Sequence, residues 1–134
     1  MPLAHEKLIV YQKAIAFVAW VGPVIDSLNA KLAAKDQLDR ASTSIALNIA
    51  EGNGKFSTKD RARFLQMALG SALECAACLD VLVARRALGA EIVVEGKGLI
   101  EGIVRLLYGL LDRFDCRLAE DAPGYGDEDE DDEG

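Results

Sequence analysis

Apolar residues recur at steps of three and four along four long stretches of this chain, and this spacing is typical of one face of an α-helix. The stretches cover about residues 6–28, 36–52, 58–86 and 91–118. The chain has only three prolines, and no segment alternates polar and apolar residues for long enough to predict a strand. Because short connections make successive helices antiparallel neighbours, the pattern predicts an all-α, up-down four-helix bundle.

The same spacing predicts which residues of each helix face the core. In the first helix these are Leu8, Tyr11, Ile15, Val18, Gly22 and Ile25. In the second helix they are Leu38, Ala41, Ile45 and Ile49. The third and fourth helices each carry two adjacent apolar stripes. Those of the third are Phe64, Ala68, Ser71, Cys75, Leu79 and Leu82, and beside them Leu65, Leu69, Ala72, Ala76 and Val83. Two stripes indicate either one wide core face or a second surface that packs against another subunit.

Particular residues predict where the helices begin, bend and end. Pro23 lacks an N–H group and predicts a kink or a break in the first helix. Residues 52–54, Gly-Asn-Gly, predict the end of the second helix, since Gly and Asn accept left-handed dihedral angles. Ser57 is expected to cap the third helix and Gly89 to stop it, while the fourth is expected to fray around Gly96.

Charge is distributed unevenly along the chain. Of its 22 acidic residues, nine lie in residues 120–134, which contain no Lys or Arg. The remaining 13 acidic residues face 15 basic ones, so the rest of the chain has a formal charge of +2. Because such an acidic segment has almost nothing to bury, we expect a bundle over residues 1–118 and a disordered acidic tail over residues 119–134.

The three cysteines lie within apolar helical stretches, which favours free thiols in a reducing, cytoplasmic compartment. Cys75 and Cys78 form a CxxC in mid-helix with no strand before it, so we expect core thiols rather than a redox pair. A zinc site would need four ligands, and only Cys116 and His5 remain to complete one. We expect no metal and no cofactor. We also expect no membrane span, because the uncharged apolar stretch over residues 14–25 has only 12 residues.

A polar stripe runs along the second helix. Arg40, Ser44, Asn48 and Glu51 recur at steps of four, four and three, and Glu74 lies in an otherwise small and apolar part of the third helix. The stripe is either a solvated face or a buried or interfacial network in which Arg40 pairs with Glu51 or Glu74, and we favour the network. No base, nucleophile or metal set surrounds these carboxylates, so we expect no catalytic residue.

A basic cluster surrounds the expected start of the third helix. It consists of Lys55, Lys59, Arg61 and Arg63. The free N–H groups of a helix N-terminus attract anions, so the cluster indicates either a nucleic-acid or anion site or an ordinary solvated helix end. It is not a Walker phosphate loop, because Phe56 interrupts the required Gly-Lys-Ser/Thr sequence.

Residues 36–74 carry a family resemblance. They begin with DQLDRASTSIALNIAEG and end with ALGSALE at residues 68–74. Together with LIVYQKA at residues 8–14, they resemble the bacterial four-helix bundle proteins encoded in 23S rRNA intervening sequences, to which accessory proteins of diversity-generating retroelements are related. The resemblance implies a homopentameric bundle without known catalysis. It also implies nucleic-acid binding, through the retroelement relatives. The acidic tail is not a feature of the family.

We therefore expect a non-enzymatic, homo-oligomeric helical bundle, pentameric by the resemblance, that binds RNA or DNA or acts as a scaffold. Two alternatives stay open. One is a protein–protein adaptor whose basic partner meets the acidic tail. The other is a ligand pocket near Arg40, Glu51 and Glu74.

Overall fold

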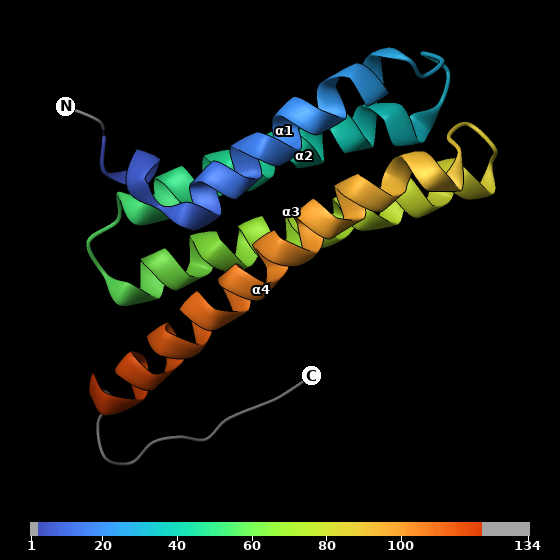
Figure 1. The fold of residues 1–134 in the computed structure, drawn as a ribbon. Helices are drawn as coiled ribbons and strands as arrows, with labels where there is room; N and C mark the ends of the chain where they lie inside the picture. Colours follow the sequence, from blue (N-terminus) through green and yellow to red (C-terminus); the bar gives the residue numbers. More distant parts are fainter. Residues whose placement is uncertain (1–2, 122–134) are drawn as a thin grey trace.

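Four antiparallel helices make up the fold (Figure 1). The computed structural model describes residues 3–121, except the side chains of residues 6, 7 and 116–121. A short 3-10 helix, η1 (Ala4–Lys7), precedes the four helices, which are α1 (Ile9–Asp26), α2 (Ala33–Asn53), α3 (Thr58–Ala84) and α4 (Ala90–Asp121). Each helix contacts its two neighbours around the bundle, with α4 closing against α1. The predicted all-α up-down bundle is confirmed. Most of the predicted acidic tail, from residue 122 onward, lies outside the described residues.

The core lies along the bundle axis and is almost entirely aliphatic. Its largest fully buried side chains include Phe17, Leu38, Ile45, Ile49, Leu79, Leu82, Ile103 and Leu107. The predicted α2 face is confirmed, since all four of its residues are buried. Among the described side chains, Ser42 is the one buried polar group, and its hydroxyl donates to the Asp39 carbonyl oxygen at 2.9 Å. Each large apolar side chain buried here contributes about 1.5–3 kcal/mol.

The predicted core face of α1 is wrong by about one position. Residues buried on α1 are Val10, Ala14, Phe17, Val21 and Ile25. Of the face expected from the sequence, only Ile25 is fully buried, and Ile15 is 43% exposed. The reason is that α1 is apolar on nearly every side, so the spacing of its apolar residues does not select one face.

The paired apolar stripes of α3 and α4 form one wide core face. In the second stripe of α3, Leu65 and Ala72 are buried, and Leu69 is half-buried against the core. In α4, Leu107 and Leu111 are buried as well, and Leu106 and Leu110 beside them are half-buried against the core. The wide-face interpretation therefore accounts for both stripes within a single chain.

The break predicted at Pro23 is absent, whereas the predicted end of α2 is confirmed. α1 continues through Pro23 to Asp26, so the proline lies in the last turn instead of breaking the helix. α2 ends at Asn53, within the predicted Gly-Asn-Gly segment, although Gly54 at its C-cap has a right-handed φ of −85° instead of a left-handed one. Gly52 is needed for packing instead, because a Cβ atom there would lie 2.9 Å from Cβ of Phe64 on α3.

The ends of α3 combine one confirmed prediction with one correction. The hydroxyl of Ser57 accepts a hydrogen bond from the Asp60 N–H at 3.0 Å, as the predicted N-cap requires. At the other end, α3 ends at Ala84, near the expected residue 86, but Arg86 rather than Gly89 takes the left-handed conformation, with a φ of 63°. The N–H groups of Arg86 and Ala87 donate to the carbonyl oxygens of Val83 and Leu82, each at 2.9 Å, which is a Schellman motif.

α4 does not fray at its glycines, and Gly96 has a packing role. A Cβ atom on Gly96 would overlap the indole ring of Trp20 on α1, where even the third-nearest ring atom, Cε3, would be 2.9 Å away. The indole also stacks on Phe17, with ring centroids 5.8 Å apart. The absent side chain of Gly96 therefore makes room for the largest aromatic ring in the chain.

Candidate functional site

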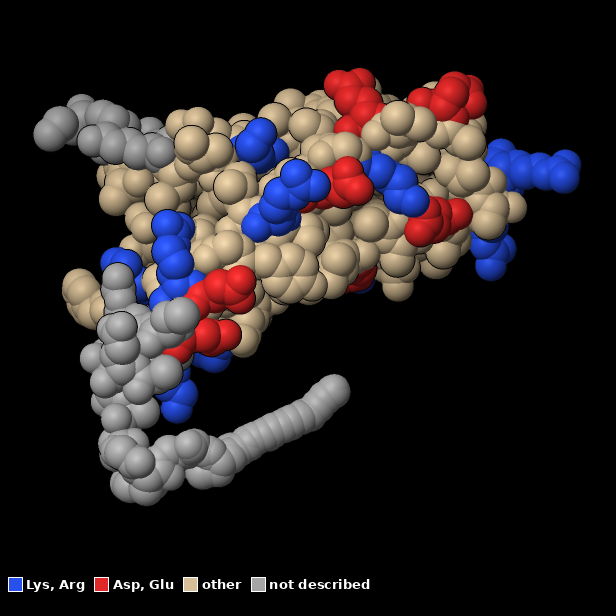
Figure 2. Space-filling model, turned by 60° about the horizontal axis from the view of Figure 1, so that its bottom comes forward, with Lys and Arg blue, Asp and Glu red and all other residues tan. Residues whose placement is uncertain are grey.

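The basic cluster lies at the end of the bundle where α2 passes into α3. Lys55 is in the connector, and Lys59, Arg61 and Arg63 follow in the first two turns of α3. Figure 2 shows several Lys and Arg side chains at the end of the molecule where α4 also ends, with Asp and Glu side chains beside them. The Arg61 Nε donates to the Lys55 carbonyl oxygen at 2.8 Å, which ties the connector to the helix.

The surroundings of the cluster leave much of its charge available. Lys55 and Arg63 each have a nearby carboxylate, Glu51 at 3.7 Å and Asp60 at 3.9 Å. All four side chains of these pairs are more than a third exposed, so the pairs are weak. Within the part of the chain that the structure describes, Lys59 makes no ion pair.

Aromatic rings accompany the basic residues. Lys55 and Arg63 both lie over the ring of Phe64, at 5.0 and 4.7 Å from its centroid. These cation–π contacts hold two positive charges beside one ring. Phe56, at the tip of the connector, is fully exposed, with a relative accessibility of 103%.

Phe56 is the residue that sequence reasoning missed. The sequence interpretation used Phe56 only to exclude a phosphate loop, whereas the structure shows that its ring is fully exposed in the connector that also carries Lys55. Exposed aromatic rings beside positive charge are what proteins use to stack unpaired bases while holding the phosphate backbone. An aromatic residue between Lys55 and Lys59, in a connector too short to bury it, was the available signal.

The predicted polar stripe of α2 lines a broad groove between α2 and α3. A small hydrogen-bond network centres on the hydroxyl of Ser44. Its Oγ accepts a hydrogen bond from Asn48 Nδ2 at 2.8 Å and another from Ser71 Oγ of α3 at 2.9 Å. Arg40 and Glu74 border the same groove but are exposed.

The predicted pairing of Arg40 is not found within one chain. Among the described residues, Arg40 makes no ion pair with Glu51 or Glu74, and Glu51 instead faces Lys55. The groove opens to solvent, so the charged groups of Arg40, Glu51 and Glu74 stay hydrated. Because they pay no desolvation cost, nothing requires them to pair. An interfacial version of the network stays a prediction.

The outward face of α3, between its grooves with α2 and α4, is largely apolar. The exposed apolar residues and the glycine on and beside it are Leu47 of α2, Met67, Gly70, Leu73, Ala77 and Val81 of α3, and Val94 and Tyr108 of α4, with Glu74 exposed among them. We call this set the outer α3 face. A Cβ atom on Gly70 would meet nothing within 4 Å, so within one chain Gly70 is a tolerated surface glycine. Exposed apolar surface of this kind is typical of interaction sites.

The two described cysteines are core residues. Cys75 and Cys78 are both buried and free. Burial, with smaller effects from Cys78 and Glu74, raises the pKa of Cys75 to about 12, and burial together with Glu74 raises the pKa of Cys78. Thiols that stay protonated at neutral pH are poor nucleophiles and poor metal ligands. Among the described residues, no group of three or more His, Cys, Asp or Glu could hold a metal ion.

By length and composition alone, α1 and α3 would each be able to cross a membrane. Each of them also buries one face in the bundle core, with Phe17 of α1 and Leu79 of α3 fully inaccessible. Core helices of bundles meet the same two criteria, so the criteria do not by themselves indicate a membrane span.

Comparison with known proteins adds two findings. A family model described as 23S rRNA-intervening sequence protein matches residues 6–109. A solved structure of a protein of unknown function from the S23 ribosomal protein family of Bacteroides thetaiotaomicron is 24% identical, with a TM-score of 0.73 over 77% of this chain and 98% of that chain. This structure supports the fold. The search of curated proteins gives no match.

Proposed function

Because the chain belongs to the 23S rRNA-intervening sequence protein family, we propose that it is a non-enzymatic, self-associating helical bundle that binds nucleic acid. The binding site is the connector between α2 and α3 with the first two turns of α3. The ligand class is single-stranded or looped RNA or DNA with unpaired bases.

The observation that supports this function is the fully exposed Phe56 ring in the connector that carries Lys55 and leads to Lys59. A base that stacks on an aromatic ring gains about 1–3 kcal/mol, and the gain depends little on sequence. Lys59 and the exposed groups of Lys55 and Arg63 would meet the phosphates that flank such a base. Stacking and charge together favour unpaired nucleic acid over a duplex, whose bases have no free face.

Self-association through the outer α3 face is the second part of the proposal. The exposed side chains of Leu73, Val94 and Tyr108 are 48%, 69% and 51% accessible in the isolated chain. A second copy packed on this face would cover them and the open Gly70 position. Five subunits are expected from the family resemblance. The buried, protonated thiols of Cys75 and Cys78 support a cytoplasmic location.

Binding of a fluorescent single-stranded oligonucleotide to the full chain at low salt tests the site. Phe56→Ala should weaken binding by about 5- to 150-fold, the equivalent of 1–3 kcal/mol, whereas Phe56→Tyr should retain most of the affinity. Lys59→Gln should lower the slope of log K against log salt by about 0.7, the value for one single-strand phosphate.

Arg85→Gln is the matched control, because Arg85 is an exposed basic residue at the opposite end of α3. It should leave both affinity and salt slope unchanged. If Phe56→Ala and Arg85→Gln bind alike, the connector is not the site. Light scattering tests the assembly separately, and a monomer at micromolar concentration would contradict self-association.

A further inference from the structure

A cavity of about 310 Å³ lies at the same end of the bundle as the basic cluster. Its floor is made of core residues, including Val10, Ile49 and Leu65, each no more than 6% exposed. Leu110 and Phe114 of α4 form one wall. The volume is at the lower end of the range for small-ligand pockets, about 300–1,000 Å³.

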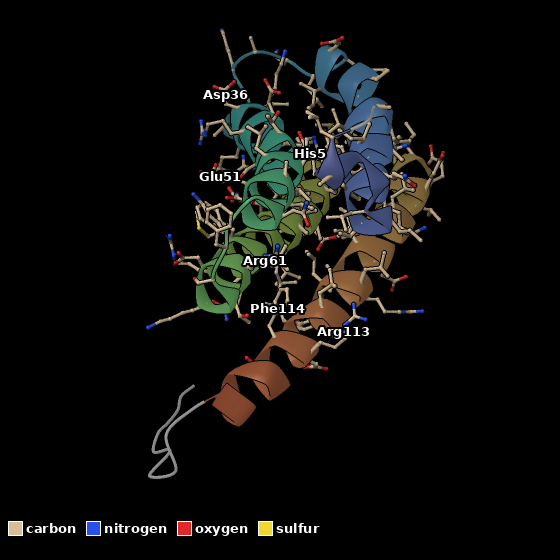
Figure 3. The ribbon with its side chains drawn as sticks, turned by 90° about the vertical axis from the view of Figure 1, so that its left-hand side faces the viewer. His5, Asp36, Glu51, Arg61, Arg113 and Phe114 are labelled. Carbon is tan, nitrogen blue, oxygen red and sulfur yellow. The ribbon has the colours of Figure 1, made fainter. Side chains whose placement is uncertain are left out.

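The rim of this end cavity is positively charged. Arg61 comes from α3 and Arg113 from α4, and Asn53 adds an amide. Figure 3 shows Arg61 on one side of this end of the bundle, with Arg113 and Phe114 on the α4 side. No carboxylate is among the described lining residues, and neither arginine makes an ion pair there. The cavity therefore suits an apolar group that carries negative charge beside it.

The chain itself contains a segment with this chemistry. Tyr125 is followed at once by Gly126 and then by seven consecutive acidic residues at positions 127–133. We propose that this segment folds back on the bundle, with the Tyr125 ring in the end cavity and the acidic residues against Arg61, Arg113 and the adjoining basic cluster.

The length of the chain permits this arrangement. α4 ends at Asp121, seven residues beyond Phe114, which is about 10 Å at 1.5 Å per residue. The four residues from Asp121 to Tyr125 reach at most about 13–14 Å. Pro123 and Gly124 lie between them, and this pair favours a reversal of chain direction. Tyr125 can therefore return to the level of the cavity wall.

A tethered segment also has an advantage over any free ligand of the same chemistry. A short linker gives an effective concentration in the millimolar range, so even a weak contact is occupied. The α4 wall of the cavity and the acidic segment both lie beyond residue 109, where the family match ends. The arrangement therefore involves residues that lie outside the part of the chain matched to the family.

Docking would also regulate the proposed function, and this consequence alone rests on nucleic-acid binding being correct. Arg61 belongs to both the cavity rim and the basic cluster. Carboxylates held there compete with phosphate for the same positive charges. The docked segment would therefore act as an internal competitor that raises the threshold for nucleic-acid binding.

The test uses the full chain with methyl and aromatic labelling at low salt. Nuclear Overhauser contacts should join the Tyr125 ring to methyl groups of Ile49, Leu65 and Leu110. Arg113→Gln should weaken these contacts. Arg85→Gln is the matched control, because Arg85 is an exposed arginine at the opposite end of α3, and this variant should leave them unchanged.

Absence of these contacts at low salt would overturn the proposal. So would contacts that appear only between differently labelled copies, or a co-purifying small molecule that occupies the cavity in native mass spectra. Tyr125→Ser should strengthen oligonucleotide binding by about tenfold, equivalent to 1.4 kcal/mol. If the contacts are present but no oligonucleotide binds, docking stands and the proposed nucleic-acid function fails.

Discussion

Replacement of Gly96 with alanine should destabilise this bundle, although alanine is the better helix former. Gly96 is buried in α4, directly beneath the indole of Trp20. An added methyl group would overlap three ring atoms of an aromatic system that is also stacked on Phe17. The ring cannot bend out of the way as a flexible side chain would, so α1 or α4 must shift.

The magnitude follows from two opposing effects. Alanine gains about 1 kcal/mol over glycine in a helix interior. Over-packing of a well-filled core costs about 1–3 kcal/mol. The expected result for Gly96→Ala is therefore between no change and a loss of about 2 kcal/mol.

Gly98→Ala is the internal control. It lies two residues away on the same helix, is exposed, and a Cβ atom there would meet nothing within 4 Å. Only the propensity gain applies, so Gly98→Ala should stabilise the bundle by about 1 kcal/mol. The two glycine variants should differ by about 1–3 kcal/mol in urea unfolding followed by circular dichroism.

Trp20 provides a second readout, because it is the only tryptophan in the chain. Gly96→Ala should shift its fluorescence emission, whereas Gly98→Ala should not. In a Trp20→Leu background the overlap is relieved, so Gly96→Ala should become neutral or stabilising. If Gly96→Ala stabilises the wild type as much as Gly98→Ala does, the indole is not seated on Gly96 and the reasoning fails.

Three further predictions concern stability, each measured by urea unfolding. Arg86→Gly should stabilise the chain by about 1 kcal/mol, because Arg86 holds a left-handed φ of 63° that costs a non-glycine residue about 1–2 kcal/mol; Arg85→Gly, at a right-handed position, should not. Ser57→Ala should cost about 1 kcal/mol through loss of the Asp60 N–H bond; an unchanged midpoint would contradict this. The raised pKa of Cys75, about 12 against 9.0 for a free thiol, means that the unfolded state releases its proton first. The contribution of Cys75 should therefore be constant below pH 9 and fall by about 1.4 kcal/mol per pH unit from there to about pH 12. Cys75→Ala should remove this contribution and leave that of Cys78.

The spacing of apolar residues correctly predicted the buried face of a helix where one side of the helix is polar and the other apolar. α2 has a clear polar face opposite Leu38 and Ile45, and all four residues predicted for its core face are buried. The Ser57 cap was predictable because it depends on local hydrogen bonding within four residues. The packing roles of Gly52 and Gly96 were not predictable in this way. They depend on side chains of other helices, Phe64 for Gly52 and Trp20 for Gly96.

In the candidate site, too, some residues could be predicted from the sequence and others could not. Lys55, Lys59, Arg61 and Arg63 were found from the sequence because charge clusters are visible there. The role of Phe56 depends on its exposure, which follows from the path of a connector between two packed helices. The end cavity depends on how far α4 extends past its neighbours, and this follows from the tertiary arrangement alone.

The uniform apolarity of α1 has a consequence for how the chain reaches its native state. Burial of hydrophobic area would reward several rotations of α1 about its own axis almost equally, because Ile15 or Val18 could replace Phe17 in the core at similar solvation free energy. The buried apolar area does not distinguish these rotations. The free-energy difference that favours the native rotation of α1 must therefore come from the steric fit of its side chains. The fit of Trp20 against Gly96 is the described contact that only one rotation allows. Without the contact between Trp20 and Gly96, α1 would still be helical and packed on the bundle. It would, however, exchange among several rotations about its own axis.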